Sequence, residues 1–256
     1  MITNAQTGTN VAEIAEGVYR INTPVAEIPG GFSFNQYLIV DDEPLLFHTG
    51  LRKLFPLVQE AIRRVMPVEK LRYIAFSHFE SDECGALNQF LAVAPDAVPL
   101  CSRVAAMVSV SDYADRPPRA MNDGERLSIG KREIVWIDAP HIPHGWETGY
   151  LFDITTRTLF AGDIFTQGGL GQEALVESDL VEPSDAFRLG FAAPLGLPDS
   201  WAHTTDSAPI VEKLASLGAT TLANMHGSAW RGSSATAASM LREFTRRVSP
   251  WSEVAQ

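Results

Sequence analysis

A short segment of the chain, 78–83, reads His-Phe-Glu-Ser-Asp-Glu and brings four ionisable side chains together. They are His78, Glu80, Asp82 and Glu83. Three carboxylates this close can all stay ionised only where water, protons or cations compensate their charge. Imidazole and carboxylate ligands without a thiolate suit iron, manganese or zinc. We therefore expect a divalent metal at this segment, with further ligands from other parts of the chain.

Three more candidate ligands each follow an apolar segment. His144 lies in Pro-His-Ile-Pro-His-Gly-Trp (140–146), Asp163 follows Leu-Phe-Ala-Gly, and His226 follows Leu-Ala-Asn-Met. A single histidine after a strand is usually an ordinary loop or core residue, so none of the three predicts a metal site by itself. Side chains that follow several strands at one rim can, however, complete a site together.

The elements that must position these residues alternate between strands and helices. Apolar or alternating segments predict strands at 17–22, 32–40, 44–47, 71–77, 98–101, 133–138, 148–153, 158–161 and 220–224. Apolar residues at helical spacing predict helices at 54–65, 86–93, 208–217 and 235–248. The segments 115–130 and 168–206 are rich in turn residues, and we expect the second to be a long surface excursion or lid. This order favours two mixed sheets that face each other, with helices outside.

The composition limits the partners. The 256 residues include 20 Lys and Arg against 31 Asp and Glu, a net charge of −11 that argues against binding to nucleic acid or to a membrane surface. The chain has no apolar stretch of the length needed to span a membrane and no signal-like start. Its two cysteines, Cys84 and Cys101, predict free thiols in a reducing cytoplasm. We expect a cytoplasmic protein that acts on a small molecule.

The candidate ligands resemble those of the metallo-β-lactamase superfamily, over about residues 10–230. Most hydrolases of that superfamily have His-x-His-x-Asp-His in the first metal loop. The diiron branch, which contains the flavodiiron and related oxygen-binding diiron proteins, has His-x-Glu-x-Asp-His, and this chain has Glu80 at the position that distinguishes the two. Asp163 follows His144 by 19 residues, and His226 follows Asp163 by 63, which is similar to the spacing in the diiron branch.

This resemblance implies both a fold and a set of ligands. The fold is the α/β metallo-β-lactamase fold, a four-layer αββα sandwich of two mixed β-sheets with outer helices. It would form a single domain over residues 1–256, with a core at about 10–230 and a C-terminal helix at about 235–248. His78, Glu80 and His144 would hold one metal, and Asp82 and His226 the other. Asp163 would bridge the two metals.

Glu83 departs from the family pattern, because it stands where a second-metal histidine is usual. We expect it either to ligate or to point away. With Glu80, Asp82 and Asp163 it could supply four negative charges to two divalent ions, which agrees better with iron redox chemistry than with a strongly Lewis-acidic hydrolase.

Three other histidines have open roles. His48 stands where the superfamily commonly has an aspartate near the metals. His141 is expected to support the site rather than ligate, because Gly149 falls five residues after His144, as in the family pattern. We expect His203 to be a surface residue, with a lid histidine over the site as the alternative.

Three functions remain open. The first is a protein with two iron ions that binds or reduces O2 or NO. The second is a hydrolase with two zinc or manganese ions that cleaves an ester, lactone or phosphodiester. The third is a gas or redox sensor without turnover. No flavodoxin phosphate loop follows His226, so we expect no flavin in this chain and electrons from a separate flavoprotein, a rubredoxin-like donor or a partner subunit. A homo-oligomer is possible.

Overall fold

The structure is a computed structural model that describes residues 1–202 and 204–248, and its strands form two sheets. The first sheet has seven strands in chain order, namely β1 (Asn10–Ala15), β2 (Val18–Val25), β3 (Phe32–Ile39), β4 (Leu45–Phe47), β5 (Tyr73–Ala75), β6 (Val98–Ser102) and β7 (Arg119–Met121). Neighbours from β1 to β4 are antiparallel, and neighbours from β4 to β7 are parallel.

The second sheet is also mixed and has seven strands. Their order across the sheet is β12 (Leu175–Val176), β14 (Ala229–Arg231), β13 (Thr221–Asn224), β11 (Thr158–Gly162), β10 (Gly149–Asp153), β9 (Glu133–Asp138) and β8 (Arg126–Ser128). Because β10 is antiparallel to both β9 and β11, and β11 is parallel to β13, the strands β9, β11 and β13 run in one direction. Their carboxyl ends therefore lie at the same edge of the sheet.

The helices belong to outer layers or to connections. The described helices are α1 (Phe55–Arg63), α2 (Ser81–Cys84), α3 (Leu87–Val93), α4 (Arg103–Ala105), α5 (Ser111–Tyr113), α6 (Val181–Ala192), α7 (Ser207–Ser216) and α8 (Ser234–Val248). Short 3₁₀ turns occur at η1 (Arg52–Leu54), η2 (Val68–Lys70) and η4 (Ala193–Leu195), and a π-helical turn at η3 (Ala106–Val110). No helix among the described residues is both long and apolar enough to cross a membrane.

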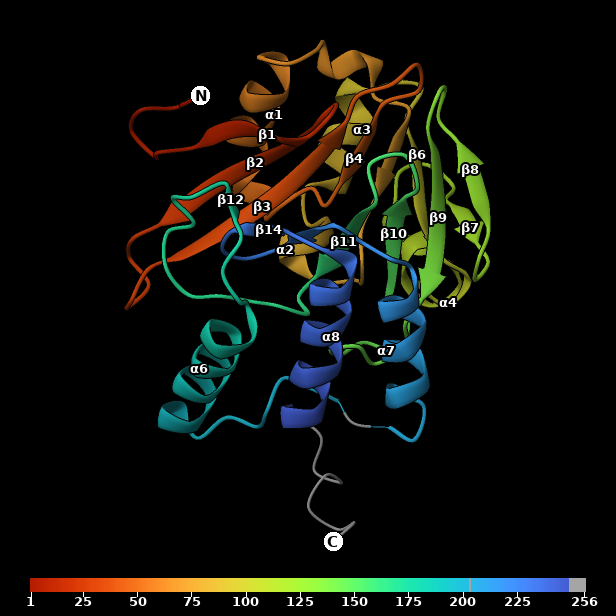
Figure 1. The fold of residues 1–256 in the computed structure, drawn as a ribbon. Helices are drawn as coiled ribbons and strands as arrows, with labels where there is room; N and C mark the ends of the chain where they lie inside the picture. The colour runs from red at the N-terminus through yellow and green to blue at the C-terminus, as the bar shows by residue number, and fades with distance from the viewer. Residues whose placement is uncertain (203, 249–256) are drawn as a thin grey trace, which may run out of the picture.

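Alternation along the strands divides the core into three layers. In β10, Leu151 joins the cluster between the sheets, whereas its neighbour Tyr150 joins the cluster under α7 and α8. In β4, Phe47 lies between the sheets and Leu46 lies under α1 and α3. Figure 1 shows α1 and α3 at the top of the molecule, α7 and α8 at the bottom, and the strands between them. The fold is therefore the predicted four-layer sandwich of two mixed sheets with outer helices. That residues 1–256 form a single domain stays a prediction.

Two of the expected loop segments contain regular structure. The segment 115–130 contains β7, in which Arg119 and Ala120 are exposed and Met121 is buried, and β8, in which Arg126 and Ser128 are exposed. The segment 168–206, expected to be a long surface excursion or lid, contains β12 and the twelve-residue helix α6, and its role as a lid stays a prediction. Pro183 and Gly190 are turn signals in the sequence. Pro183 nevertheless fits α6, because it lies in the first turn, where the N–H that proline lacks would have no partner within the helix.

Candidate metal centre

The candidate ligands come together because their strands end on facing rims. His144, Asp163 and His226 follow the carboxyl ends of β9, β11 and β13 in the second sheet, and His78 follows β5 in the first. The chain then turns at Glu80 into α2, which carries Asp82 and Glu83 on a single helical turn. This segment, predicted as a loop, is thus a short helix.

A first group of ligand atoms surrounds the imidazole of His78. The Nε2 atom of His78 lies 3.0 Å from Nε2 of His144, and each of these atoms lies 3.7 Å from Oδ2 of Asp163. Glu80 Oε1 lies 3.2 Å from His144 Nε2 and 3.7 Å from His78 Nε2. Two imidazoles and two carboxylates could therefore share one cation.

A second group surrounds His226. Its Nε2 atom lies 3.4 Å from Asp82 Oδ2 and 3.3 Å from Asp163 Oδ1. Since the other oxygen of Asp163 faces the first group, this carboxylate stands between the two groups. The hydrogen bond and charge of His226 outweigh the effect of burial, so the pKa of Asp163 lies below its ordinary value.

Glu83 points into the site rather than away from it. It could share a cation with His78 and Glu80 or with Asp82 and His226. Its side chain is 0% exposed, and neither oxygen has a hydrogen-bond partner among the described residues. Burial, together with the charges of Asp163 and Asp82, raises the pKa of this carboxyl well above its ordinary value. A buried carboxyl without a partner is costly, and a cation would stabilise it. The donor set therefore fits a pair of metal ions.

The site opens into a cavity of about 660 Å³. Glu80, Asp82, His144, Asp163 and His226 lie on its surface. Its other walls are mainly apolar and include Phe32, Phe34, Phe187, Phe191, Leu197 and Trp201. A ligand in this cavity would thus contact the metal-binding side chains at one end and aromatic rings elsewhere.

Residues 32–187 match the protein family described as ODP family beta lactamase. The chain belongs to this family. Over 169 residues it is 27% identical to the nitric oxide reductase of Moorella thermoacetica. The alignment covers 60% of this chain and 41% of that protein. The chain thus spans less than half of the length of that curated relative. It spans only 24% of the length of another curated relative that it matches.

Solved structures share the fold of this ODP family member. Rubredoxin oxygen:oxidoreductase from Desulfovibrio gigas superposes with a TM-score of 0.77 at 19% identity, over 93% of this chain and 61% of that chain. The flavodiiron protein of Giardia intestinalis gives a TM-score of 0.75 at 19% identity, over 93% of this chain and 59% of that one. Both contain a region with the two-sheet architecture described above.

His78 is held by a chain of hydrogen bonds that involves His48. The backbone N–H of Ser77 donates to His48 Nε2 at 3.3 Å, so this nitrogen is an acceptor. Ser77 Oγ lies 3.0 Å from His48 Nε2 and 2.9 Å from His78 Nδ1. The Ser77 hydroxyl therefore donates to His48, and its oxygen can accept from the Nδ1–H of His78. Because the proton of His78 is then on Nδ1, its Nε2 is free for a cation. In this ODP family member, His48 thus supports the site through Ser77.

His226 is held by β3. Its Nδ1 atom donates to the carbonyl oxygen of Ser33 at 2.9 Å, which leaves Nε2 free to face the carboxylates. Asn35 Nδ2 donates to the carbonyl of Gly227 at 2.8 Å, and Arg20 Nη2 donates to the same carbonyl at 2.7 Å. Arg20 and Asn35 are polar residues within two largely apolar strands, which is the sequence signal for this support. The sequence analysis did not identify these two residues.

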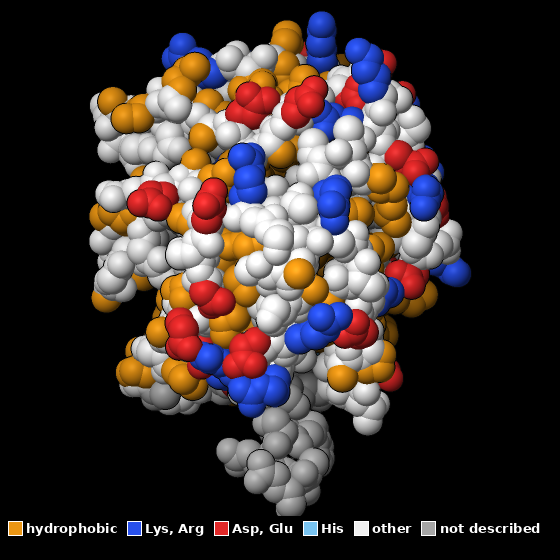
Figure 2. Space-filling view, viewed as in Figure 1, with side chains coloured by type: hydrophobic (Ala, Val, Ile, Leu, Met, Phe, Trp, Pro, Cys, Tyr) orange, Lys and Arg blue, Asp and Glu red, His pale blue; other side chains and the backbone are white. Residues whose placement is uncertain are grey.

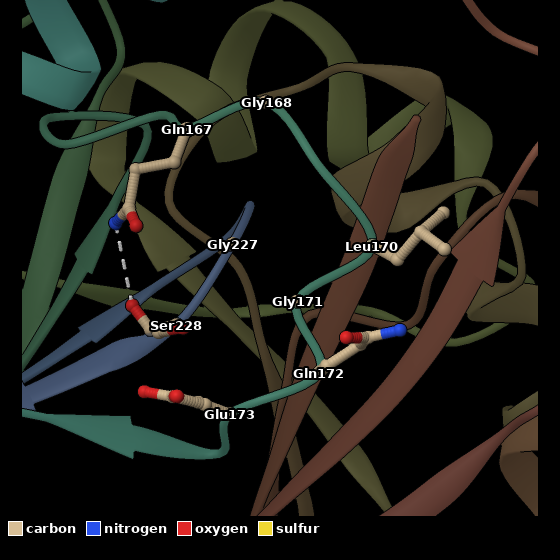
Figure 3. Close-up of a pocket in the computed structure, with 8 residues that line it drawn as sticks. All are labelled: Gln167, Gly168, Leu170, Gly171, Gln172, Glu173, Gly227 and Ser228. Carbon is tan, nitrogen blue, oxygen red and sulfur yellow. Dashed lines mark hydrogen bonds between the residues drawn. The ribbon is translucent and has the colours of Figure 1, made fainter. Parts of the chain in front are cut away.

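The segment 167–173 braces the other side of the His226 loop. Figure 3 shows it passing Gly227 and Ser228, with Gln167 Nε2 donating to the Ser228 carbonyl at 3.4 Å. Arg20 Nη2 also donates to the carbonyl of Gly171 at 2.9 Å. The buried guanidinium of Arg20 therefore ties two loops to the first sheet.

None of the remaining candidates that the structure describes belongs to the two groups. His141 is in none of the ligand groups found among the described residues, and its backbone N–H donates to the Gly145 carbonyl at 2.7 Å. His203 lies outside the described residues, so its predicted roles stay open. Cys84 and Cys101 are free and buried, and burial raises the pKa of each thiol to about 12.

Proposed function

We propose that this member of the ODP family binds two iron ions and uses them to bind or reduce O2 or NO. The observation that carries the proposal is the contact of 3.2 Å between Glu80 Oε1 and His144 Nε2. It places a carboxylate where the hydrolase pattern has a third histidine. Two histidines with carboxylates and open positions are typical of non-haem iron sites.

The proposed ligands fall into two sets. His78, Glu80 and His144 would hold one iron, and Asp82, Glu83 and His226 the other. Asp163 would bridge them, since its two oxygens face different groups. Glu83 is included because both of its oxygens are buried without a partner in the described chain.

A bound iron pair would supply one-electron redox chemistry and open coordination positions for a diatomic gas. The chain's own residues fix the ligands and limit water. Ser77 and Ser33 accept hydrogen bonds from His78 and His226, and so fix the nitrogen that each histidine presents to the metal. The apolar cavity walls reduce the water around the gas.

The source of electrons is also part of the proposal. Relatives carry the names nitric oxide reductase and rubredoxin oxygen:oxidoreductase. We propose a separate flavoprotein or rubredoxin-like protein as the donor for this chain. A cytoplasmic location and a homo-oligomeric state, both raised by the amino-acid sequence, stay predictions.

Metal content and gas consumption test this proposal together. Protein expressed with iron and zinc both available should contain about two irons per chain and should consume O2 or NO when supplied with a reduced rubredoxin. Glu80→His should bind less iron and lose consumption, whereas the exposed control Glu16→Gln should retain both. Two zinc ions per chain and no gas consumption would contradict the proposal.

A dinuclear zinc or manganese hydrolase is the second candidate, and the cavity favours it. About 660 Å³ is ample for an ester or lactone. Protein reconstituted with zinc should then hydrolyse a p-nitrophenyl ester, because zinc can activate water without any redox step. Absence of turnover with both zinc and manganese would reject this candidate.

A further inference from the structure

The cavity over the candidate metal centre is far larger than a diatomic gas requires. Its volume is about 660 Å³, whereas a water-sized molecule occupies about 30 Å³ in the liquid. Sites for organic ligands commonly span about 300–1,000 Å³. The cavity thus has the dimensions of an organic ligand site.

One wall of the cavity is a stack of aromatic rings that begins at the metal centre. The ring of Phe32 stacks on that of His226 with centroids 4.3 Å apart, and on that of Phe187 at 5.4 Å. Phe187 in turn stacks on Phe191 at 5.6 Å. All four rings line the cavity. Aromatic side chains favour an aromatic ligand, because offset and edge-to-face contacts between rings add to apolar burial.

The helix α6, which carries Phe187 and Phe191, is anchored at its start, whereas the residues toward and just after its C-terminal end are apolar and exposed. Arg247 Nη2 of α8 lies 2.7 Å from Glu182 Oε1 at the start of α6. Beyond the anchor, Leu189 and Leu195 are 54% and 63% exposed. Figure 2 shows hydrophobic side chains at the lower left, over α6. The cavity therefore adjoins an apolar surface across which an apolar molecule could enter.

We propose that this cavity binds one aromatic organic molecule. Its ring lies against Phe187, in the stack of rings that begins at His226. The molecule's contact with the metal ions, as a second ligand beside the gas or as the substrate, rests on the proposed function. Its binding to the apolar walls does not, because those walls are present without metal.

Calorimetric titration with 1-naphthol tests this site, in metal-free and in iron-loaded protein. We expect one molecule per chain in both forms, and no binding of the equally compact but polar myo-inositol. Phe187→Ala should weaken binding about tenfold, through the lost ring contact. Ala192→Trp should abolish binding by filling the cavity. The control Leu189→Ala changes an exposed residue of the same helix outside the cavity and should bind as the parent protein does.

The outcomes separate this inference from the proposed function. Absence of naphthol binding overturns the inference, as do several molecules per chain or binding that persists in Ala192→Trp with its fold intact by circular dichroism. If Ala192→Trp does not fold, unchanged affinity in Phe187→Ala overturns it instead. Protein that binds naphthol as expected, but takes up no iron and consumes no gas, supports this cavity as a ligand site and rejects the proposed function alone.

Discussion

The Nε2 atoms of His78 and His144 lie 3.0 Å apart, and the two imidazole rings are almost perpendicular, at 89°. Both nitrogens therefore point to one place, where Glu80 and Asp163 each contribute an oxygen within 3.7 Å. Two neutral imidazoles that both present a lone pair repel each other, so a proton or a cation must lie between them. The metal-free arrangement is thus one that a cation would stabilise.

Removal of metal should lower the thermal stability of the protein. A ligand that binds only the folded state at 100 times its Kd adds about 2.7 kcal/mol to the free energy of unfolding. For a protein of this size that corresponds to a fall in Tm of about 5–10 °C when a chelator removes the ions. Differential scanning calorimetry with and without iron measures the shift. The exposed control Glu16→Gln should show the same shift, and an identical Tm of the parent protein in both conditions would count against the metal centre.

Substitution of Ser77 should weaken metal binding without removing a ligand. Its hydroxyl joins His48 to His78 through contacts of 3.0 Å and 2.9 Å, and so orients the His78 ring. Loss of such an outer partner typically raises the Kd for a metal about 10- to 100-fold. Competition with a chelator of known affinity would measure this change in Ser77→Ala. The exposed control Ser128→Ala should leave the Kd unchanged, and equal values for the two variants would reject the role of Ser77.

The amino-acid sequence was sufficient for elements whose own side chains alternate or recur. The predicted strand 133–138 coincides with β9, and the predicted helix 208–217 lies within one residue of α7. Strands that depend on their neighbours were missed. In β8, Arg126 and Ser128 are exposed around the buried Leu127, and the strand is defined by its pairing with β9. Such pairing is not local, so a sequence window does not contain it.

The candidate ligands were predictable from residue type and spacing, but their support was not. The structure brings His78, Glu80, Asp82, Glu83, His144, Asp163 and His226 together, and their binding of metal stays a prediction. The partner of His48, by contrast, is 29 residues away at Ser77. Its position depends on the pairing of β4 with β5, which brings the ends of the two strands together.

Acid should destabilise the protein in part through His48. Burial lowers the pKa of this imidazole from its ordinary value of 6.5 to about 3. Below pH 6.5 the unfolded chain therefore binds a proton that the folded protein does not. His48 thus lowers the free energy of unfolding as pH falls from about 6.5 to 3, by up to about 1.4 kcal/mol per pH unit.

The variant His48→Asn isolates this effect. Asparagine tolerates the positive φ of 66° at this position but does not titrate. Urea unfolding of metal-free protein between pH 7.5 and pH 4.5 should show a shallower loss of stability in His48→Asn than in the parent. The control Arg157→Asn also replaces a residue at positive φ and should keep the parent slope. Equal slopes for parent and His48→Asn would show that this histidine is not the acid-sensitive group.

Gly227 should be essential for the position of His226 for two reasons. Its φ is positive, and a larger side chain at this position would collide with a neighbouring loop. Gly227 has φ of +83°, and an added Cβ would lie 2.6 Å from Cβ of Gln167 in the segment 167–173 (Figure 3). Gly124 has a similar φ of +74°, but an added Cβ there meets nothing within 4 Å. The two glycines therefore separate backbone strain from crowding.

Gly124→Ala should cost only the strain of a left-handed alanine, about 1–2 kcal/mol. Gly227→Ala should cost about 1–3 kcal/mol more, because overpacking forces the loops apart. Since His226 precedes Gly227 directly, that movement should also reduce metal content from about two ions per chain towards one. Urea unfolding and elemental analysis of both variants measure the two effects. If Gly227→Ala matched Gly124→Ala in stability and in metal content, the loop contact would have no part in holding His226.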